Sequence, residues 1–182
     1  GLEMKDMDPF ILLDYNAKME VTPSDTPRGV GVHPHRGFET VTIAYNGKVQ
    51  HHDSAGNGGI IGTGDVQWMT AASGVLHKEY YEKEWSRQGG TFQMVQLWTN
   101  LPKADKMSAP GYQAIPNETM GRYVLPGNSG FVEVIAGKYN DVEGPAHTHS
   151  PINLMNARLN PGGKATFSFP ESYNTALLVV QG

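Results

Sequence analysis

The sequence contains no cysteine. Disulfides and thiolate ligands are therefore excluded, and any bound metal must be held by nitrogen and oxygen atoms. The formal net charge is -4 at pH 7, whereas a general nucleic-acid-binding protein is usually basic. No run approaches the roughly 20 apolar residues that a membrane-spanning helix needs. Residues 1–6 are polar and lack the apolar core of a signal peptide. We therefore expect a cytoplasmic protein, also nuclear in a eukaryotic source, with no membrane and no direct nucleic-acid partner.

Long segments with helical periodicity are also missing. Instead, 22 glycines and 12 prolines separate many short β-prone runs, a pattern typical of an all-β sandwich or barrel. Residues 16–31 and 102–116 are rich in breakers and are predicted to be mainly connecting segments. The predicted strands are Pro9–Tyr15, Phe38–Tyr45, Lys48–Asp53, Ile60–Ile61, Val66–Thr70, Val75–Tyr81, Thr91–Thr99, Arg122–Leu125, Phe131–Ala136, Asn153–Leu159, Lys164–Phe169 and Ala176–Val180.

Two histidines, His33 and His35, precede the alternating segment Phe38–Tyr45. Residues i and i+2 of an extended strand point to the same face of a sheet. His33 and His35 can therefore direct two imidazoles to one point. Imidazole is a suitable ligand for zinc, copper, iron and nickel.

A second pair, His77 and Glu79, repeats this spacing with a histidine and a carboxylate. Three histidines and one glutamate from two strands would make a mononuclear metal site. The alternative interpretation is a metal-free structural cluster.

Four ordered motifs extend this pattern along the chain. Several motifs in order and at matching spacing are specific, whereas a lone His-x-His is not. They resemble the signatures of the pirin family within the cupin superfamily, and the similarity runs from Pro9 through Gln113 and more weakly beyond. The motifs are His33-Pro-His-Arg-Gly-Phe-Glu-Thr-Val41, Gly64-Asp-Val-Gln-Trp-Met-Thr-Ala71, Gly74-Val-Leu-His-Lys-Glu79 and Gln96-Leu-Trp-Thr-Asn-Leu-Pro102.

The resemblance implies a bicupin, that is, two antiparallel β-barrels of jelly-roll type with metal in the N-terminal barrel only. We expect residues 1–116 to form the metal-binding cupin and residues 117–182 to begin a C-terminal cupin without metal. The second part has too few predicted strands to close a barrel of the same kind, so we expect it to be truncated. A monomer is expected.

The resemblance also implies a ligand set: iron bound by His33, His35, His77 and Glu79. Manganese, nickel, copper and zinc are alternatives, because three imidazoles and a carboxylate accept several first-row ions. Glu39 fits the carboxylate position of the general cupin pattern. In pirin-like proteins the carboxylate role falls to the residue at position 79, which leaves Glu39 as a hydrogen-bond or salt-bridge partner.

The activity implied by the resemblance is cleavage of the flavonol quercetin by dioxygen. In outline, the metal lowers the pKa of the substrate's enol oxygens as a Lewis acid. Glu79 would be both ligand and catalytic base, accepting the 3-hydroxyl proton. The expected partners are then a flavonol and dioxygen.

Two other functions remain open. The resemblance to pirins also implies a second function, an iron-dependent binding module that regulates a transcription factor or a metabolic enzyme. The expected partner would then be another protein. A third interpretation is a cupin that handles sugars or organic acids without redox chemistry.

The remaining candidates have weaker signals. Gln96 could hydrogen-bond a substrate or a ligand. The adjacent His51 and His52 point to opposite faces of a regular strand, so they cannot chelate as a pair and are predicted to be structural. His147 and His149 repeat the His-x-His spacing without a downstream partner and are predicted not to bind metal. Side chains that could wall a cavity or belong to the core are Phe38, Trp68, Met69, Met94 and Trp98.

Overall fold

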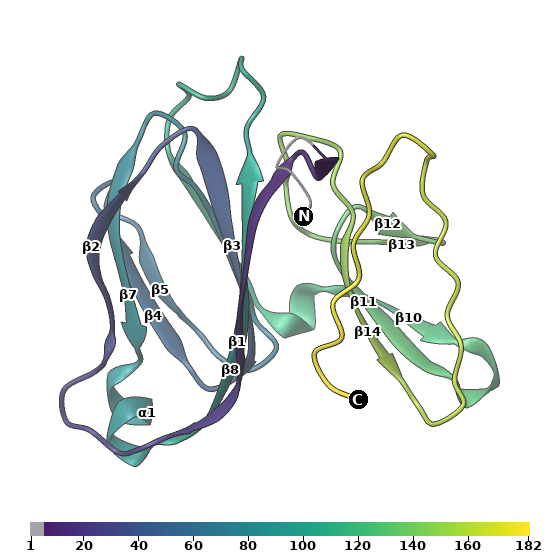
Figure 1. Cartoon of the computed structure of the whole chain (residues 1–182), viewed down its shortest axis with the longest axis horizontal. Helices are drawn as coiled ribbons and strands as arrows, with labels where there is room; N and C mark the ends of the chain where they lie inside the picture. The colour runs from purple at the N-terminus through teal and green to yellow at the C-terminus, as the bar shows by residue number, and fades with distance from the viewer. Residues whose placement is uncertain (1–5) are drawn as a thin grey trace.

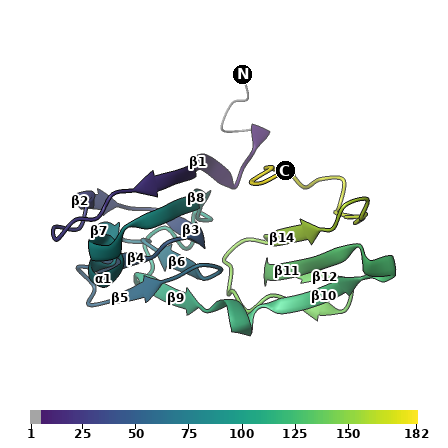
Figure 2. The same ribbon diagram turned by 90° about the horizontal axis from the view of Figure 1, so that it is seen from below.

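The computed structural model describes residues 6–182 and contains two groups of strands that lie side by side (Figure 1). The first group runs from β1 to β9 and the second from β10 to β14. Figure 2 shows β9 leading from the first group toward β10 of the second. The all-β prediction is confirmed, and none of the helices in residues 6–182 has the length and apolar character needed to cross a membrane.

Two antiparallel sheets make up the first group. One is five-stranded, in the order β1-β8-β3-β6-β9, and the other is four-stranded, in the order β2-β7-β4-β5. The strand bounds are β1 (Phe10–Val21), β2 (Gly29–His35), β3 (Phe38–Asn46), β4 (Val49–Asp53), β5 (Gly58–Ile61), β6 (Val66–Thr70), β7 (Val75–Tyr81), β8 (Gly90–Asn100) and β9 (Gly111–Ile115). This is the jelly-roll barrel arrangement expected of a cupin.

The second group is smaller. It contains a three-stranded sheet, β10-β11-β14, and a two-stranded sheet, β12-β13. Within the described residues these strands do not make a second barrel of the size of the first, in agreement with the expected incomplete cupin. The bounds are β10 (Gly121–Leu125), β11 (Gly130–Ala136), β12 (Lys138–Tyr139), β13 (Val142–Glu143) and β14 (Leu154–Leu159), with short 3₁₀ turns at Asn117–Thr119 and Pro126–Asn128.

Alternation along the strands of the five-stranded sheet gives its two faces different roles. On one face, Val41, Trp68 and Leu97 join a buried apolar cluster that also contains Ile135 of β11. This cluster therefore packs the five-stranded sheet against the second group of strands. The opposite face carries Thr42, Gln67 and Gln96. All three donate hydrogen bonds to the carboxylate of Glu79 in β7. That face therefore lines the space between the two sheets of the barrel.

Several local predictions were wrong. The first strand continues from Tyr15 to Val21, because polar residues that give a weak strand signal still pair with β8, as in the register of Glu20 with Thr91. β9 lies inside the predicted connector and pairs with β6. The helix α1 (Lys83–Gln88) was not predicted; the Glu82 side chain caps it by accepting hydrogen bonds from the backbone N–H groups of residues 84 and 85.

The predicted strands at residues 164–169 and 176–180 are also wrong. No strand is present in either segment. Single hydrogen bonds anchor this part of the chain: the Tyr139 hydroxyl donates to the Thr166 carbonyl, and the Tyr15 hydroxyl donates to the Val180 carbonyl. A β-prone sequence becomes a strand only when a neighbouring strand supplies the ladder of hydrogen bonds.

Candidate metal centre

The candidate metal centre lies where β2 pairs with β7 in the four-stranded sheet. His33 is directly opposite His77 in the antiparallel register, so their side chains share a face. The register of β2 shifts between Val30 and His33. Such a bulge changes the direction of the side chains that follow it, and here it precedes the two histidines of the strand.

Three imidazole nitrogens converge at this position. Nε2 of His33 is 3.0 Å from Nε2 of His35 and 2.8 Å from Nε2 of His77. Two nitrogens that bind one metal at about 2.1 Å with a right angle between them are about 3.0 Å apart. The three side chains are thus brought together with a spacing that fits adjacent positions around one metal ion.

The backbone fixes the tautomer of His33. Its Nδ1 lies 2.7 Å from the carbonyl oxygen of Gly31. Nδ1–H therefore donates to that carbonyl, which leaves the lone pair of Nε2 available to a metal. Hydrogen bonds of this kind orient metal-binding histidines generally.

Burial keeps two of the imidazoles neutral. The pKa of His35 falls from 6.5 to about 4 because of burial and then because of the charge of His33. The pKa of His77 falls to about 3 because of burial and then because of His33 and His35. A neutral imidazole is the form that binds metal, so both side chains have free lone pairs at pH 7.

Glu79 lies beside His77 in a second group of possible ligand atoms, formed with His51. Within each group the ligand atoms are within 4.8 Å of one another, and His77 belongs to both groups. The carboxylate of Glu79 accepts hydrogen bonds from Gln67 (Nε2 to Oε1, 3.2 Å) and from Gln96 (Nε2 to Oε2, 2.9 Å). Glu79 is thus close to His77 and is held by two amides of the opposite sheet, but it does not belong to the group that contains His33 and His35.

Glu39 faces away from this centre. It alternates with Thr40 and shares its face of β3 with Val41, a member of the apolar core. The residue is 1% exposed, and its carboxylate accepts hydrogen bonds from the hydroxyls of Thr70 (2.7 Å) and Thr99 (3.1 Å). The side chain is therefore a hydrogen-bonded part of the packing between the strands.

Sequence reasoning did not place His51 at the centre. Alternation along β4 puts Val49, His51 and Asp53 on one face, and His51 is opposite Glu79 in the register with β7. It is fully buried, and its Nδ1 is 3.1 Å from Nδ1 of His77. His52 is exposed, as the opposite-face argument requires. The alternation that places His51 on the same inward face as Val49 is the sequence signal that could have placed His51 near the metal centre.

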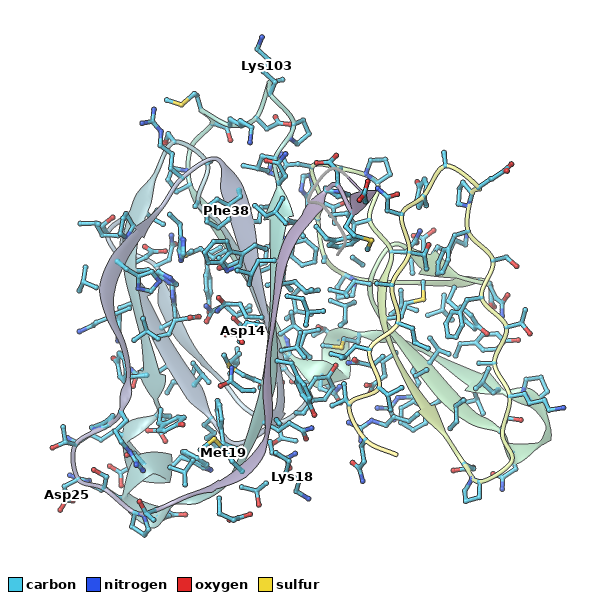
Figure 3. The ribbon with its side chains drawn as sticks, in the orientation of Figure 1. Asp14, Lys18, Met19, Asp25, Phe38 and Lys103 are labelled. Carbon is cyan, nitrogen blue, oxygen red and sulfur yellow. The ribbon has the colours of Figure 1, made fainter. Side chains whose placement is uncertain are left out.

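Two aromatic rings lie next to the histidines. Trp98 stacks on Phe38 with ring centroids 4.6 Å apart, and its centroid is 5.1 Å from that of His35. The Trp98 indole N–H donates to Oε1 of Gln96. Figure 3 labels Phe38 within the first group of strands.

The other wall candidates lie elsewhere in the packing. Trp68 belongs to the core on the opposite face of the five-stranded sheet. Met69 packs with Val75 and Tyr112, and Met94 packs against a separate cluster that contains Phe92.

The second His-x-His pair, His147 and His149, lies between β13 and β14. Among residues 6–182, the groups of three or more candidate ligand side chains include neither His147 nor His149. Nδ1 of His149 lies 3.6 Å from a carboxylate oxygen of Asp105, and the backbone N–H of His147 donates to Gln113. That these two histidines do not bind metal therefore stays a prediction.

Comparison with known proteins gives consistent matches. The pirin family model matches residues 1–99. A protein of Pseudomonas aeruginosa, provisionally named a quercetin 2,3-dioxygenase, is 50% identical over 176 residues, covering 97% of this chain and 62% of that protein. Human pirin is 34% identical over 182 residues, covering 99% of this chain and 58% of that protein.

One solved structure is similar to this chain in both fold and sequence. The crystal structure of quercetin 2,3-dioxygenase from Acinetobacter baumannii aligns with a TM-score of 0.81 at 51% identity, covering 84% of this chain and 53% of that chain. The chain thus spans between about half and two thirds of the length of these relatives.

Proposed function

Because the chain belongs to the pirin family, we propose that it carries the metal centre of a dioxygenase that cleaves quercetin or a similar flavonol with dioxygen. The observation that carries this proposal is the convergence of three imidazole Nε2 atoms, with His33 at 2.8 Å from His77 and at 3.0 Å from His35. The 51% identity to a quercetin 2,3-dioxygenase supports the substrate class.

The proposed ligands are His33, His35, His77 and Glu79, and iron is the proposed metal, with manganese, nickel, copper and zinc as alternatives. The three nitrogen atoms and one carboxylate suit such ions. The metal would act as a Lewis acid on the flavonol oxygens and leave coordination positions open to substrate and dioxygen. We also propose that residues 1–116 form this metal-binding unit and that residues 117–182 begin a second unit without metal. The sheets support this division, because among residues 6–182 no sheet combines strands from both sides of the boundary.

Glu79 is the proposed base for the 3-hydroxyl proton of the flavonol. Its Oε1 accepts hydrogen bonds from Gln67 and Thr42, whereas Oε2 accepts one from Gln96. A carboxylate oxygen has two lone pairs, so Oε2 retains one. This lone pair would bind the metal, and it would accept the substrate proton once the carboxylate has detached from the metal. The two amides restrict the movement of the carboxylate while it takes up the proton.

The stacked pair Trp98 and Phe38 would receive the flat rings of the flavonol. Both rings adjoin His35, so an aromatic substrate packed on them lies next to the proposed metal. Stacking of this kind contributes roughly 0.5–1.5 kcal/mol beyond the area that is buried. The same rings would help to keep water from the reacting oxygens.

The test is flavonol consumption and oxygen uptake by protein reconstituted separately with iron, manganese, nickel, copper or zinc. The proposal predicts coupled loss of flavonol and dioxygen with at least one redox-active metal. Trp98→Leu is expected to raise KM for the flavonol, whereas Trp85→Leu, in the cluster with Tyr81 and Phe92, should leave KM unchanged. Absence of oxygen-dependent flavonol loss with every metal contradicts the proposal.

A second candidate function is an iron-dependent binding module. The observation that favours it is the exposure of apolar side chains on the strands that carry the histidines: Val30, Val32 and Leu76 are 58%, 67% and 49% exposed. Exposed apolar side chains that gather in a patch mark protein contacts. Partner binding that differs between the ferrous and ferric forms, without flavonol turnover, would support this function. Turnover with unchanged partner binding would exclude it.

A further inference from the structure

Both ring nitrogens of His77 have a partner. Nε2 faces His33 in the proposed metal centre, and Nδ1 lies 3.1 Å from Nδ1 of His51. On the far side of the His51 ring, Nε2 is 3.4 Å from Oδ2 of Asp53. The three side chains form a continuous series from the metal centre to a carboxylate.

Only one arrangement of protons satisfies this series when His77 binds a metal. Nε2 of His77 must present its lone pair to the metal, so its proton is on Nδ1. Nδ1–H then donates to Nδ1 of His51, which must be the acceptor. The proton of His51 is therefore on Nε2 and is donated to Asp53, whose carboxylate can only accept.

The far end of the series is fixed by backbone contacts. Oδ1 of Asp53 accepts hydrogen bonds from the backbone N–H groups of Ala55 and Asn57, both at 2.9 Å. The Asn57 side-chain amide also donates to Oδ2 at 3.2 Å. The turn after β4 therefore holds the carboxylate in the position that receives the His51 proton.

The plane of the His51 ring is fixed as well. Tyr112 stacks on it with ring centroids 5.3 Å apart and an interplanar angle of 6°. Gly59 makes room for this tyrosine, because a Cβ atom at that position would lie 2.8 Å from the tyrosine oxygen. His51 is fully buried, so water does not compete with its hydrogen bonds.

We propose that His51, held by Asp53, is a positioning residue that fixes the tautomer and ring orientation of the metal ligand His77. This inference rests on the metal centre proposed above and deepens it. Loss of such outer hydrogen-bond partners lowers metal affinity by about 10–100-fold in other proteins.

The experiment compares His51→Leu, His51→Asn and the control His52→Leu in the full chain. Asparagine keeps an acceptor oxygen close to the position of Nδ1, whereas leucine fills the space without an acceptor. A packing role therefore predicts that leucine is tolerated better, and an orienting role predicts the reverse. The control removes the neighbouring exposed ring, which stacks on Tyr80 on the outside of the sheet.

The readouts are the Kd for Fe(II) and Cu(II), measured by competition with a chromophoric chelator, and the EPR spectrum of the Cu(II) protein. We expect His51→Leu to raise Kd about 10–100-fold and to alter the EPR spectrum. His51→Asn should recover most of the affinity and the wild-type spectrum, and His52→Leu should match wild type. Thermal unfolding of the metal-free variants checks that each is folded.

Three results from a protein that binds metal would overturn the inference. One is a Kd for His51→Leu within about threefold of wild type. Another is a His51→Asn variant that binds no better than His51→Leu while both are folded. The third is a wild-type protein with two metal ions per chain that loses one in His51→Leu, because His51 would then be a ligand. Metal binding without flavonol turnover refutes the proposed reaction alone, whereas a wild-type protein that binds no metal refutes both.

Discussion

Replacement of Glu79 and of Glu39 by glutamine, in separate variants, distinguishes a metal ligand from a packing residue. Glu79 and Glu39 are both largely buried and both accept hydrogen bonds. Of the two, only Glu79 shares a group of possible ligand atoms with the proposed ligand His77. We expect Glu79→Gln to lose metal and flavonol turnover, and Glu39→Gln to retain both.

The magnitudes follow from the hydrogen bonds around each carboxylate. Loss of an outer partner costs about 10–100-fold in metal affinity, so loss of a ligand should exceed about 100-fold in Glu79→Gln. Gln67 can limit the cost in stability, because its Oε1 has no partner and can accept from the new amide. We expect a change in unfolding free energy of about 1 kcal/mol in the metal-free protein.

Glu39→Gln should lose stability but keep its metal affinity, the opposite of Glu79→Gln. Its two hydrogen bonds from Thr70 and Thr99 change from charge-assisted, at about 1.5–3 kcal/mol each, to neutral, at about 0.5–1.5 kcal/mol each. The expected loss of stability is therefore roughly 2 kcal/mol, with metal Kd within about threefold of wild type. Urea unfolding of the metal-free proteins and chelator competition give the two numbers. Loss of metal in Glu39→Gln with retention in Glu79→Gln would refute the assignment.

Two further predictions concern the histidines and the strand pairing. The unfolding free energy of the metal-free protein should fall by on the order of a few kcal/mol as pH drops from 6.5 toward 4. Unfolded histidines gain protons near 6.5, whereas folded His35 and His77 gain them only near 4 and 3; a flat profile in urea unfolding would contradict this sign. Gly29→Ala should destabilise the pairing of β2 with β7 and weaken metal binding, because its Cβ would lie 2.2 Å from the Glu79 carbonyl oxygen. Gly31→Ala, with no atom within 4 Å of its Cβ, should be close to wild type in both thermal unfolding and metal Kd.

The site residues best predicted from the sequence are those whose spacing along a strand decides which face of the sheet their side chains occupy. His33 and His35 share a face because of strand periodicity, and His77 joins them through the register of β2 with β7. The barrel was predictable because short alternating runs separated by turn residues have few other stable arrangements. The same alternation places Glu39 and Thr42 on opposite faces of β3, and Thr42 is on the face toward β7.

The features that were not predicted depend on contacts between distant segments. His51 reaches His77 only because β4 pairs with β7, and its own sequence neighbourhood suggests an exposed polar strand end. Residues 16–21 extend β1 because β8 offers a partner, although their own polarity favours a loop. The segment 164–180 has strand propensity but makes isolated hydrogen bonds instead of a ladder.

The most direct test of the metal centre is the metal content of protein purified without added metal. Elemental analysis of the wild type is compared with that of the triple variant His33→Ala, His35→Ala and His77→Ala. The three converging Nε2 atoms predict one first-row metal ion per wild-type chain and essentially none in a folded triple variant. A wild-type protein without metal, or a triple variant with undiminished metal content, would contradict the assignment of these histidines as ligands.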